Sequence, residues 1–412
     1  MARPWVSVVA LLLVRRQLTR RATKVVLLAL LSLTATGEAQ RIKLPMSRND
    51  LEARAQQDSL DAAAHYNVAL AYWNEKRFDD AEREFKTAAA IDGKFAEAYL
   101  ALAYLPYARR PKLWAEEERG QVPAEWKAAV EESDRMYRRA FLVNPMVDLR
   151  IAGAATPPRD PRWETLWPGV YDFYFQAFDD MLQGDYEKAY GRFARLHRER
   201  RIDGPGQGKL PTSVSWFEGL AAAHTQRWDE ARKKFEDLIE ESVEFEKKHA
   251  DDVIRIPLRT NEYRYFLASI QHAGGQTDAA LDLYRKTLEA DLGLYMAHVQ
   301  MANIYESQRR YPEAIEERKR AVDANPDDAS LLMDLGVTIG KSGNFAEGES
   351  VLQQAFDANP RDPRISFWTA LCQAEQGKRE EAKASLTRFL ATAPARWDKQ
   401  IALAKQRLAA LQ

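Results

Sequence analysis

The second half of the chain repeats one pattern of apolar and polar positions. The pattern begins at residue 261 and begins again at residues 295, 329, 363 and 397, which is every 34 residues. Within each block apolar residues recur three and four positions apart, and this spacing predicts amphipathic α-helices. A turn divides each block into two helices, and an Asn-Pro or Ala-Pro pair ends the second helix, because proline cannot continue a helix. We therefore predict a tandem array of helix–turn–helix units.

Small side chains stand where the two helices of such a unit approach each other. In the first helix a large residue precedes a small one, as in Met301-Ala302 and Leu335-Gly336. The small residues that open the core face of the second helices are Ala280, Ala314, Gly348 and Ala382. Because a small residue lets the neighbouring helix come close, we expect tightly packed helix pairs.

The first half of the chain carries the same unit with interruptions. Blocks begin near Ala62, Ala96, Val170 and Thr212, and the second of them contains an insertion at 107–123. The predicted organisation is a signal peptide at 1–39, a lead-in at 40–61, two repeats at 62–145, a Pro/Trp-rich linker at 146–169, two repeats at 170–245, a connector at 246–260, four repeats at 261–396 and a capping helix at 397–412. This division gives eight helix pairs.

The blocks resemble the tetratricopeptide repeat (TPR) at the positions of its signature residues, and four consecutive blocks match in phase. The resemblance implies an all-α fold, a right-handed superhelical α-solenoid of about eight repeats in which each repeat packs on the next. One apolar helical stripe, as a C-terminal capping helix requires, is formed by Trp397, Ile401, Ala404, Leu408 and Leu411. With the basic and apolar N-terminus described below, we expect a member of the exported bacterial type.

In the TPR family the fifth residue of each repeat points into a concave groove. The resemblance, with the neighbours of the third block added, gives these binding residues: Tyr66, Leu100, Tyr171, Tyr174, Phe178, Trp216, Tyr265, Val299, Met333 and Phe367. All of them are apolar or aromatic, and contiguous exposed apolar surface usually marks a binding site. We expect Tyr174, Trp216 and Tyr265 to be its mostly exposed anchors. The alternative is that the insertion, the linker or a tight superhelix covers the row as ordinary core.

An apolar row suits an extended or helical peptide segment. TPR modules that clamp chaperone C-termini use Lys and Asn at these positions, so that role is not expected here. The resemblance therefore implies a non-enzymatic scaffold or adaptor whose partner is a protein or peptide. The alternative is a glycan-binding component of an envelope or polysaccharide-export system, in which groove aromatics stack on sugar rings. The sequence leaves the oligomeric state open.

Composition and charge give no sign of nucleic-acid binding, metal binding or catalysis. Lys and Arg number 60 against 61 for Asp and Glu, so the net charge of −1 gives no electrostatic footprint for nucleic acid. The single cysteine, Cys372, excludes an intrachain disulfide and a thiolate zinc cluster. No two histidines have the helical spacing of a metal site, although His224 and His272 could meet in the groove. We therefore predict no catalytic residue, no metal and no cofactor.

The N-terminal residues have the order of an export signal. Basic residues at 15–24 precede the apolar run 25–33, and the small residues near Ala39 suit cleavage after that residue. The apolar run is shorter than the roughly 20 residues that a bilayer crossing needs, so we expect no transmembrane span in the mature chain. The twin-arginine and general export routes both stay open. The sequence thus predicts a periplasmic or envelope-associated protein.

Overall fold

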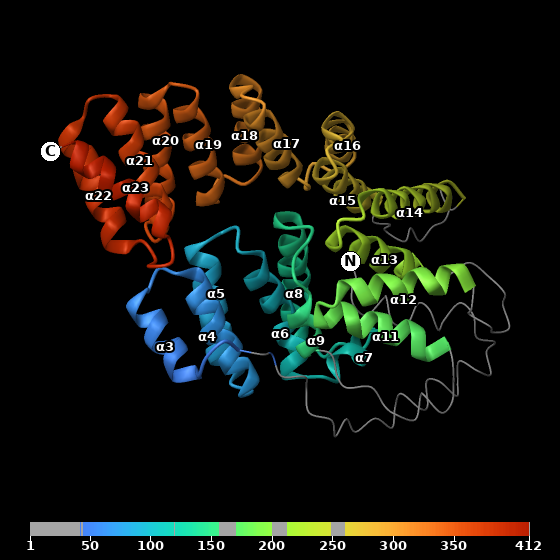
Figure 1. The fold of residues 1–412 in the computed structure, drawn as a ribbon. Coiled ribbons are helices and arrows are strands. Elements are labelled where there is room, and N and C mark those ends of the chain that lie inside the picture. Colours follow the sequence, from blue (N-terminus) through green and yellow to red (C-terminus); the bar gives the residue numbers. More distant parts are fainter. Residues whose placement is uncertain are drawn as a thin grey trace. The chain divides into compact units, whose positions relative to one another are not determined.

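The computed structural model describes residues 42, 44–118, 120–155, 170–199, 212–248 and 260–411, and its regular elements there are helices (Figure 1). The fold class predicted from the sequence, an all-α solenoid, is confirmed in these ranges. The predicted signal peptide at 1–39, most of the linker at 146–169 and most of the connector at 246–260 lie outside the described residues.

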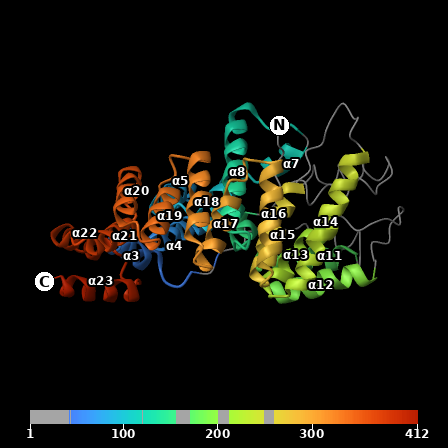
Figure 2. The same cartoon turned by 90° about the horizontal axis from the view of Figure 1, so that it is seen from above.

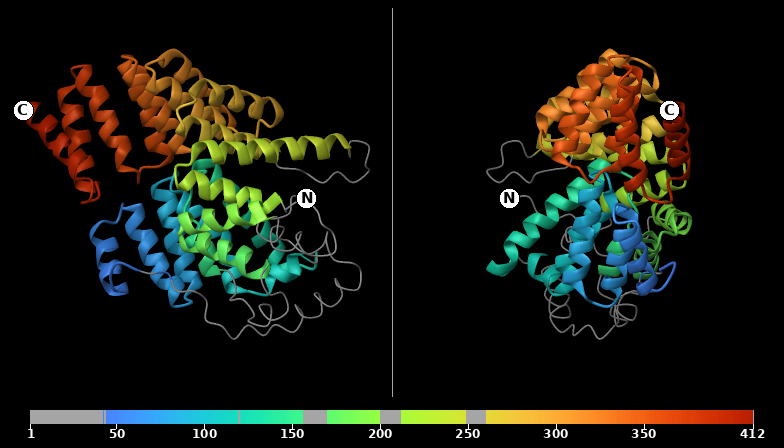
Figure 3. Two further views of the ribbon diagram at one scale, coloured as in Figure 1. Left: turned by 45° about the vertical axis from the view of Figure 1, so that its right-hand side comes forward. Right: turned by 90° about the vertical axis from the view of Figure 1, so that its left-hand side faces the viewer.

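The helices follow one another in antiparallel pairs. The helices of the first half are α3 (Arg48–Gln57), α4 (Ala62–Asn74), α5 (Phe78–Ile91), α6 (Ala96–Arg109), α7 (Leu113–Glu118), α8 (Ala124–Val143), α9 (Arg150–Ala155), α11 (Val170–Gln183) and α12 (Tyr186–Glu199). Those of the second half are α13 (Thr212–His224), α14 (Trp228–Lys248), α15 (Thr260–Ala273), α16 (Thr277–Ala290), α17 (Met296–Ser307), α18 (Tyr311–Ala324), α19 (Ala329–Lys341), α20 (Phe345–Ala358), α21 (Pro363–Glu375), α22 (Arg379–Thr392) and α23 (Asp398–Ala410). The helix α14 is drawn in yellow-green in Figure 3 and is longer than its counterparts in the other pairs.

Local sequence sets where the helices begin and turn. Asp61, Asp328 and Asp362 precede α4, α19 and α21, and each side chain accepts a hydrogen bond of 3.0 Å from the backbone N–H two residues further on. Such N-caps satisfy donors that a helix start leaves unpaired. Between paired helices the backbone enters the left-handed region, at φ 95° for Gly343 and 59° for Arg309. Glycine adopts this region without strain, which explains why it marks several of these turns.

The small residues of the pattern allow the close helix contact expected of them. A Cβ atom added to Gly336 would lie 2.8 Å from Cγ of Leu352 in the paired helix, and one added to Gly348 would lie 2.9 Å from the backbone N of Gly340. The helices α19 and α20 could not approach so closely with larger residues there. The second helix of a pair also contributes a large buried residue, such as Phe235, which is 0 % exposed.

The chain divides into two compact units. Unit 1 comprises residues 1–42 and 100–283, and unit 2 comprises residues 43–99 and 284–412. The boundaries fall inside α6 and α16.

In unit 1 the segment predicted as an insertion, 107–123, begins while α6 is still helical and contains α7. Tyr107, Leu113 and Val130 form one apolar cluster, which Trp126 of α8 also joins. The insertion therefore has an apolar core of its own against α6 and α8.

In unit 2 consecutive helices from α17 to α23 lie side by side (Figure 2). The last helix, α23, occupies the segment predicted to cap the array. Its Ala404 is 0 % exposed and joins Phe367 and Phe389 in one apolar cluster. The helices α3, α4 and α5 belong to the same unit, although α5 ends at Ile91 and α17 begins only at Met296.

Candidate functional site

The structure buries most of the side chains that were predicted to line an exposed groove. Their exposed fractions are 0 % for Leu100 and Tyr265, 3 % for Val299, 4 % for Trp216, 5 % for Met333 and 7 % for Phe367. Tyr66 and Phe178 are partly buried, and the side chains of Tyr171 and Tyr174 lie outside the described residues. The expectation of mostly exposed anchors is therefore wrong for Trp216 and Tyr265.

In unit 1 Trp216 packs among other aromatic rings. We call Trp216, Phe235, Tyr263 and Phe266 the aromatic cluster. The ring centroid of Trp216 lies 4.7 Å from that of Phe266, 5.2 Å from that of Phe235 and 5.4 Å from that of Tyr263. These rings come from three successive helices, α13, α14 and α15. Trp216 thus contacts its neighbours as core residues do and has no free face of the kind that a groove anchor needs.

Tyr265 is buried by a segment far away in the sequence. Its hydroxyl group donates a 2.5 Å hydrogen bond to the backbone carbonyl of Leu142, at the end of α8. The neighbouring Phe141 lies 5.7 Å from Phe266 between ring centroids. The end of α8 therefore covers the position at which the family pattern places an open groove.

In unit 2 the fifth residues of the repeats are buried by adjacent repeats. Met333 shares an apolar cluster with Leu352 and Ile365, and Ile365 belongs to the next block. Phe367 packs against Phe389 with a centroid distance of 5.1 Å. These side chains hold successive repeats together, which explains why they are apolar.

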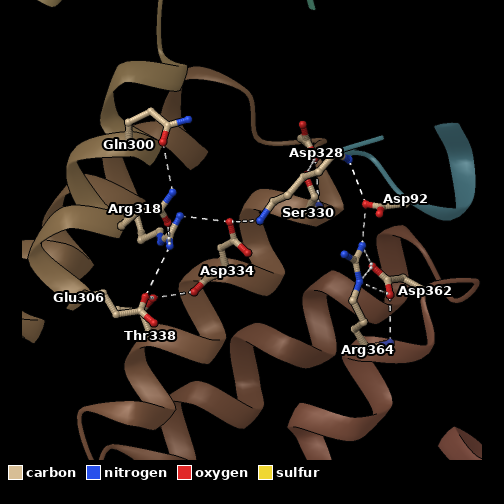
Figure 4. Close-up of polar contacts among 12 residues, drawn as sticks. Asp92, Gln300, Glu306, Arg318, Asp328, Ser330, Asp334, Thr338, Asp362 and Arg364 are labelled. Carbon is tan, nitrogen blue, oxygen red and sulfur yellow. Dashed lines mark hydrogen bonds and ion pairs between the residues drawn. The ribbon is translucent and has the colours of Figure 1, made fainter. Parts of the chain in front are cut away.

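Polar side chains, which the sequence analysis did not single out, gather on α17, α18 and α19 instead (Figure 4). We call Glu306, Arg318, Asp334, Thr338 and Lys341 the charged cluster. Arg318, only 6 % exposed, is at its centre. Its guanidinium group donates to Asp334 at 3.1 Å and lies 3.5 Å from Glu306. One arginine therefore joins carboxylates from two different repeats.

The second half of the charged cluster surrounds Glu306. Its carboxylate accepts hydrogen bonds from the Thr338 hydroxyl group at 2.9 Å and from the Lys341 ammonium group at 2.5 Å. Burial alone would raise the pKa of Glu306, but the hydrogen bond and charge of Lys341 outweigh it and lower that pKa. Burial acts on Asp334 in the same way, and the charges of Lys94 and Arg318 bring its pKa below the ordinary value. Both carboxylates are therefore ionised near neutral pH.

A second charged group lies beside the cluster at the start of α21. Asp362 caps the helix and also binds the guanidinium group of Arg364, with its shortest contact at 2.6 Å. Arg364 reaches Asp92 of the α5–α6 loop at 2.8 Å, and Lys94 of the same loop pairs with Asp334. Figure 4 shows Asp92, Asp362 and Arg364 close together at one side of the charged cluster. Residues from both ends of unit 2 thus complete one polar surface.

This arrangement suits recognition better than proton transfer. A general acid or base needs a pKa near the working pH, whereas opposite charges hold Glu306 and Asp334 in their ionised forms. Within the described ranges no group of three or more His, Cys, Asp and Glu side chains could hold a metal ion. None of the helices described there has the length and apolar character needed to cross a membrane.

The two histidines considered as a groove pair have different surroundings. His224 stacks on Tyr186 with a centroid distance of 3.8 Å and an interplanar angle of 8°. Burial lowers the pKa of His224 to about 4, so its ring is neutral at neutral pH. His272 is exposed. The described contacts of His224 therefore assign it to packing in unit 1.

One signal in the sequence could have indicated the charged cluster. Counting from the block starts at 295, 329 and 363, the sixth residues are Gln300, Asp334 and Trp368. They are polar or large, whereas the fifth residues are uniformly apolar. Asp334, a sixth residue, belongs to the charged cluster. Trp368, the sixth residue of the next block, lies at its edge, because Lys341 is 5.3 Å from the centroid of the Trp368 ring.

Comparison with known proteins agrees with this architecture. Two tetratricopeptide-repeat family profiles match the chain, one at residues 62–95 and the other at residues 299–338 and 340–398. No curated protein matches it in sequence.

Three solved structures are among those that the chain matches. The C-terminal part of a TPR repeat-containing protein from Cytophaga hutchinsonii is 16 % identical, with a TM-score of 0.46, and the match covers 58 % of this chain and 87 % of that one. MamA from Desulfovibrio magneticus RS-1 is 15 % identical, with a TM-score of 0.36 and coverage of 44 % and 94 %. YrrB, described as a TPR protein with an unusual peptide-binding site, is 22 % identical, with a TM-score of 0.31 and coverage of 38 % and 76 %.

Proposed function

Because the chain is a tetratricopeptide-repeat protein, we propose that it is a non-enzymatic scaffold that holds a segment of a partner protein on its C-terminal repeats. The observation that carries this proposal is the charged cluster, in which side chains of α17, α18 and α19 are fixed by hydrogen bonds across repeats. Fixed polar groups bind a ligand without the cost of ordering them first.

The edge of the charged cluster offers groups that a partner could reach. Lys341 is 37 % exposed, and Asn303, whose side-chain oxygen accepts from Arg318 at 2.6 Å, is also exposed. Trp368 is partly buried beside Lys341. We therefore propose a partner segment with polar and charged side chains, in place of the apolar segment expected from the sequence.

A variant at this edge tests the proposal. Lys341→Glu places a second carboxylate beside Glu306 and should abolish capture of the partner by the full-length protein in an affinity experiment read by mass spectrometry. Lys319→Glu is the matched control, because Lys319 is 50 % exposed on α18 and lies outside the charged cluster. Proteins captured by the parent and the control but lost with Lys341→Glu support the proposal, whereas equal capture by all three contradicts it.

The same experiment separates a protein partner from a glycan. A sugar ring stacked on the indole of Trp368 is the alternative occupant of this edge. Capture that survives protease treatment of the extract and is lost on competition with envelope polysaccharide would favour the glycan-binding alternative.

We also propose that the protein is exported, on the basis of the basic, apolar and small residues at 15–39. N-terminal sequencing of protein recovered from the periplasm of a bacterial host should begin at Gln40. Recovery of the intact chain from the cytosol alone would contradict export.

A further inference from the structure

The loop that follows α5 touches the recognition surface of the C-terminal repeats within unit 2. We call Asp92, Gly93 and Lys94 the docking loop. The carboxylate of Asp92 lies 2.8 Å from the Arg364 guanidinium group, and the ammonium group of Lys94 pairs with Asp334. Two opposite charges of the loop thus meet two opposite charges of α19 and α21, and Figure 4 shows the Asp92–Arg364 contact.

Gly93, the central residue of the docking loop, lies close to Ser330 because it has no side chain. A Cβ atom added to Gly93 would lie 3.3 Å from Oγ and 3.4 Å from Cβ of Ser330, at the start of α19. The 3.3 Å distance is tighter than most real Cβ contacts, so a side chain at this position would press on the Ser330 hydroxyl group and require a shift of a few tenths of an ångström. The surface therefore accepts an acid, a residue without a side chain and a base in this order.

Further contacts around the docking loop are polar as well. Asn359 donates a 2.8 Å hydrogen bond to the backbone carbonyl of Ala90, and Arg396 lies 2.9 Å from the Asp61 carboxylate. Asn359 and Arg396 both belong to segments that join successive repeats. The α4–α5 hairpin is thus held at the ends of neighbouring repeats by hydrogen bonds and ion pairs.

The apolar cores on the two sides of this contact are separate. One cluster contains Ala62, Ala88 and Ile91 and extends to residues of α4, α5, α6 and the loop between α5 and α6. The cluster around Met333 and Leu352 contains residues of α19, α20 and α21. The cations of the ion pairs between the two sides are partly exposed, with Lys94 at 31 % and Arg364 at 27 %, whereas Asp334 is 11 % exposed. When the docking loop leaves, Arg318 still pairs with Asp334 and Asp362 still pairs with Arg364, so neither recognising residue is left without an opposite charge.

We propose that Arg364, Ser330 and Asp334 form a recognition site for a partner segment with consecutive acidic, glycine and basic residues, and that the docking loop occupies this site when the partner is absent. The inference rests on the proposed scaffold function and names the chemistry of its partner. Arg364 binds the acid, Ser330 packs against the glycine and Asp334 binds the base. The partner displaces the docking loop and does not bind beside it.

A labelled peptide with the sequence of residues 90–97 tests this proposal on the full-length protein by fluorescence anisotropy. In Lys94→Glu the loop carries a carboxylate opposite Asp334 and should leave the site, while the recognising residues stay unchanged. We expect this variant to bind the peptide at least tenfold more tightly than the parent. Lys86→Glu is the matched control, since Lys86 is 65 % exposed on α5 and pairs with Glu82, and it should bind like the parent.

A second peptide, in which the lysine is replaced by glutamate, measures whether the site reads charge. It should bind at least tenfold more weakly to Lys94→Glu than the native peptide does. Equal affinity of the two peptides, or equal affinity of the parent and Lys94→Glu for the native peptide, overturns the proposal.

A milder variant covers the case in which Lys94→Glu does not fold, as judged by circular dichroism. Asp92→Asn removes the charge that faces Arg364 and keeps a side-chain oxygen that can accept from the backbone N–H of Lys94. It should raise peptide affinity about threefold, and an unchanged affinity overturns the proposal. Failure of this site can be told apart from failure of the scaffold function. If Lys341→Glu loses a captured partner while no variant binds the peptide, the scaffold function stands and the acid–glycine–base site does not.

Discussion

The aromatic cluster of unit 1 and the charged cluster of unit 2 occupy related places in their repeats but are built differently. Around Trp216 and Tyr265, rings from α13, α14 and α15 pack closely, and the end of α8 supplies the acceptor for the Tyr265 hydroxyl group. Around Arg318, ion pairs and hydrogen bonds join α17, α18 and α19. Apolar packing depends on burial alone, whereas ion pairs respond to charge, pH and salt. Loss of apolar side chains should therefore destabilise unit 1 most, whereas changes of charge and salt should act mainly on unit 2.

Removing a ring from the aromatic cluster should have the largest effect. Trp216→Ala leaves a cavity among Phe235, Tyr263 and Phe266 and should lower the free energy of unfolding by about 3–5 kcal/mol, measured by urea denaturation. Trp368→Ala is the matched control. Because Trp368 is only partly buried, this substitution should lower the free energy of unfolding by less. A Trp216→Ala variant that unfolds like the parent would show that this side chain is an exposed anchor after all.

Removing the central cation of the charged cluster should have the next largest effect. Arg318→Met leaves Glu306 and Asp334 without the guanidinium group that joins them, and breaking a buried pair costs about 3 kcal/mol or more. Lys94 and Lys341 still compensate part of the negative charge of Asp334 and Glu306, so we expect the free energy of unfolding to fall by about 3 kcal/mol and not by more.

The matched control is Arg320→Met. Arg320 is on the same helix, is 51 % exposed and pairs with Glu316 and Glu317, so its loss should cost less than about 1 kcal/mol. Equal effects of the two substitutions on urea denaturation would contradict a structural role for the charged cluster.

Local pattern predicted the fold far better than it predicted the site. Helix pairs, turns and caps depend on neighbouring residues, so the 34-residue spacing was sufficient to place them. The exposure of Tyr265 depends on Leu142, which is 123 residues away, and no local pattern reports that contact.

The charged cluster escaped prediction for a related reason. Its charges cancel across repeats, so neither net charge nor a charge run indicates it. Arg318 and Asp334 become partners only once α18 and α19 are packed side by side. The sixth position of each repeat was the one local clue, and it becomes informative when it is read across several blocks together.

The pH dependence of unit 1 offers a third test. His224 has a pKa of about 4 in the folded protein against an ordinary value of 6.5, because burial disfavours its charged form. The unfolded chain therefore binds a proton between pH 6.5 and 4 that the folded chain does not. Unit 1 should lose stability as pH falls through this window, by up to about 1.4 kcal/mol per pH unit.

Hydrogen exchange of α12 and α13 at pH 4.5 and 6.5, corrected for intrinsic rates, measures this effect. His224→Phe keeps a ring against Tyr186 but removes the titrating group, so the difference between the two pH values should shrink. A difference that is the same in the parent and in His224→Phe would assign the pH dependence to other groups.

Salt should produce the smallest effect and should separate the two units most directly. Raising the salt concentration from about 0.05 to 1 M shortens the screening length to about 3 Å, which weakens partly exposed pairs such as Lys94–Asp334 and Asp92–Arg364. A loss of up to about 1 kcal/mol corresponds to roughly fivefold faster exchange of the amides at 90–97. The amides at 216–221, inside the aromatic cluster, should exchange at nearly the same rate in both solutions, because ring packing surrounds Trp216 and the neighbouring Lys234–Glu218 pair is buried, with Glu218 only 5 % exposed, and buried pairs are screened much less by salt. Salt-independent exchange at 90–97 would mean that packing and not charge holds the docking loop, and the contrast between the two units would then disappear.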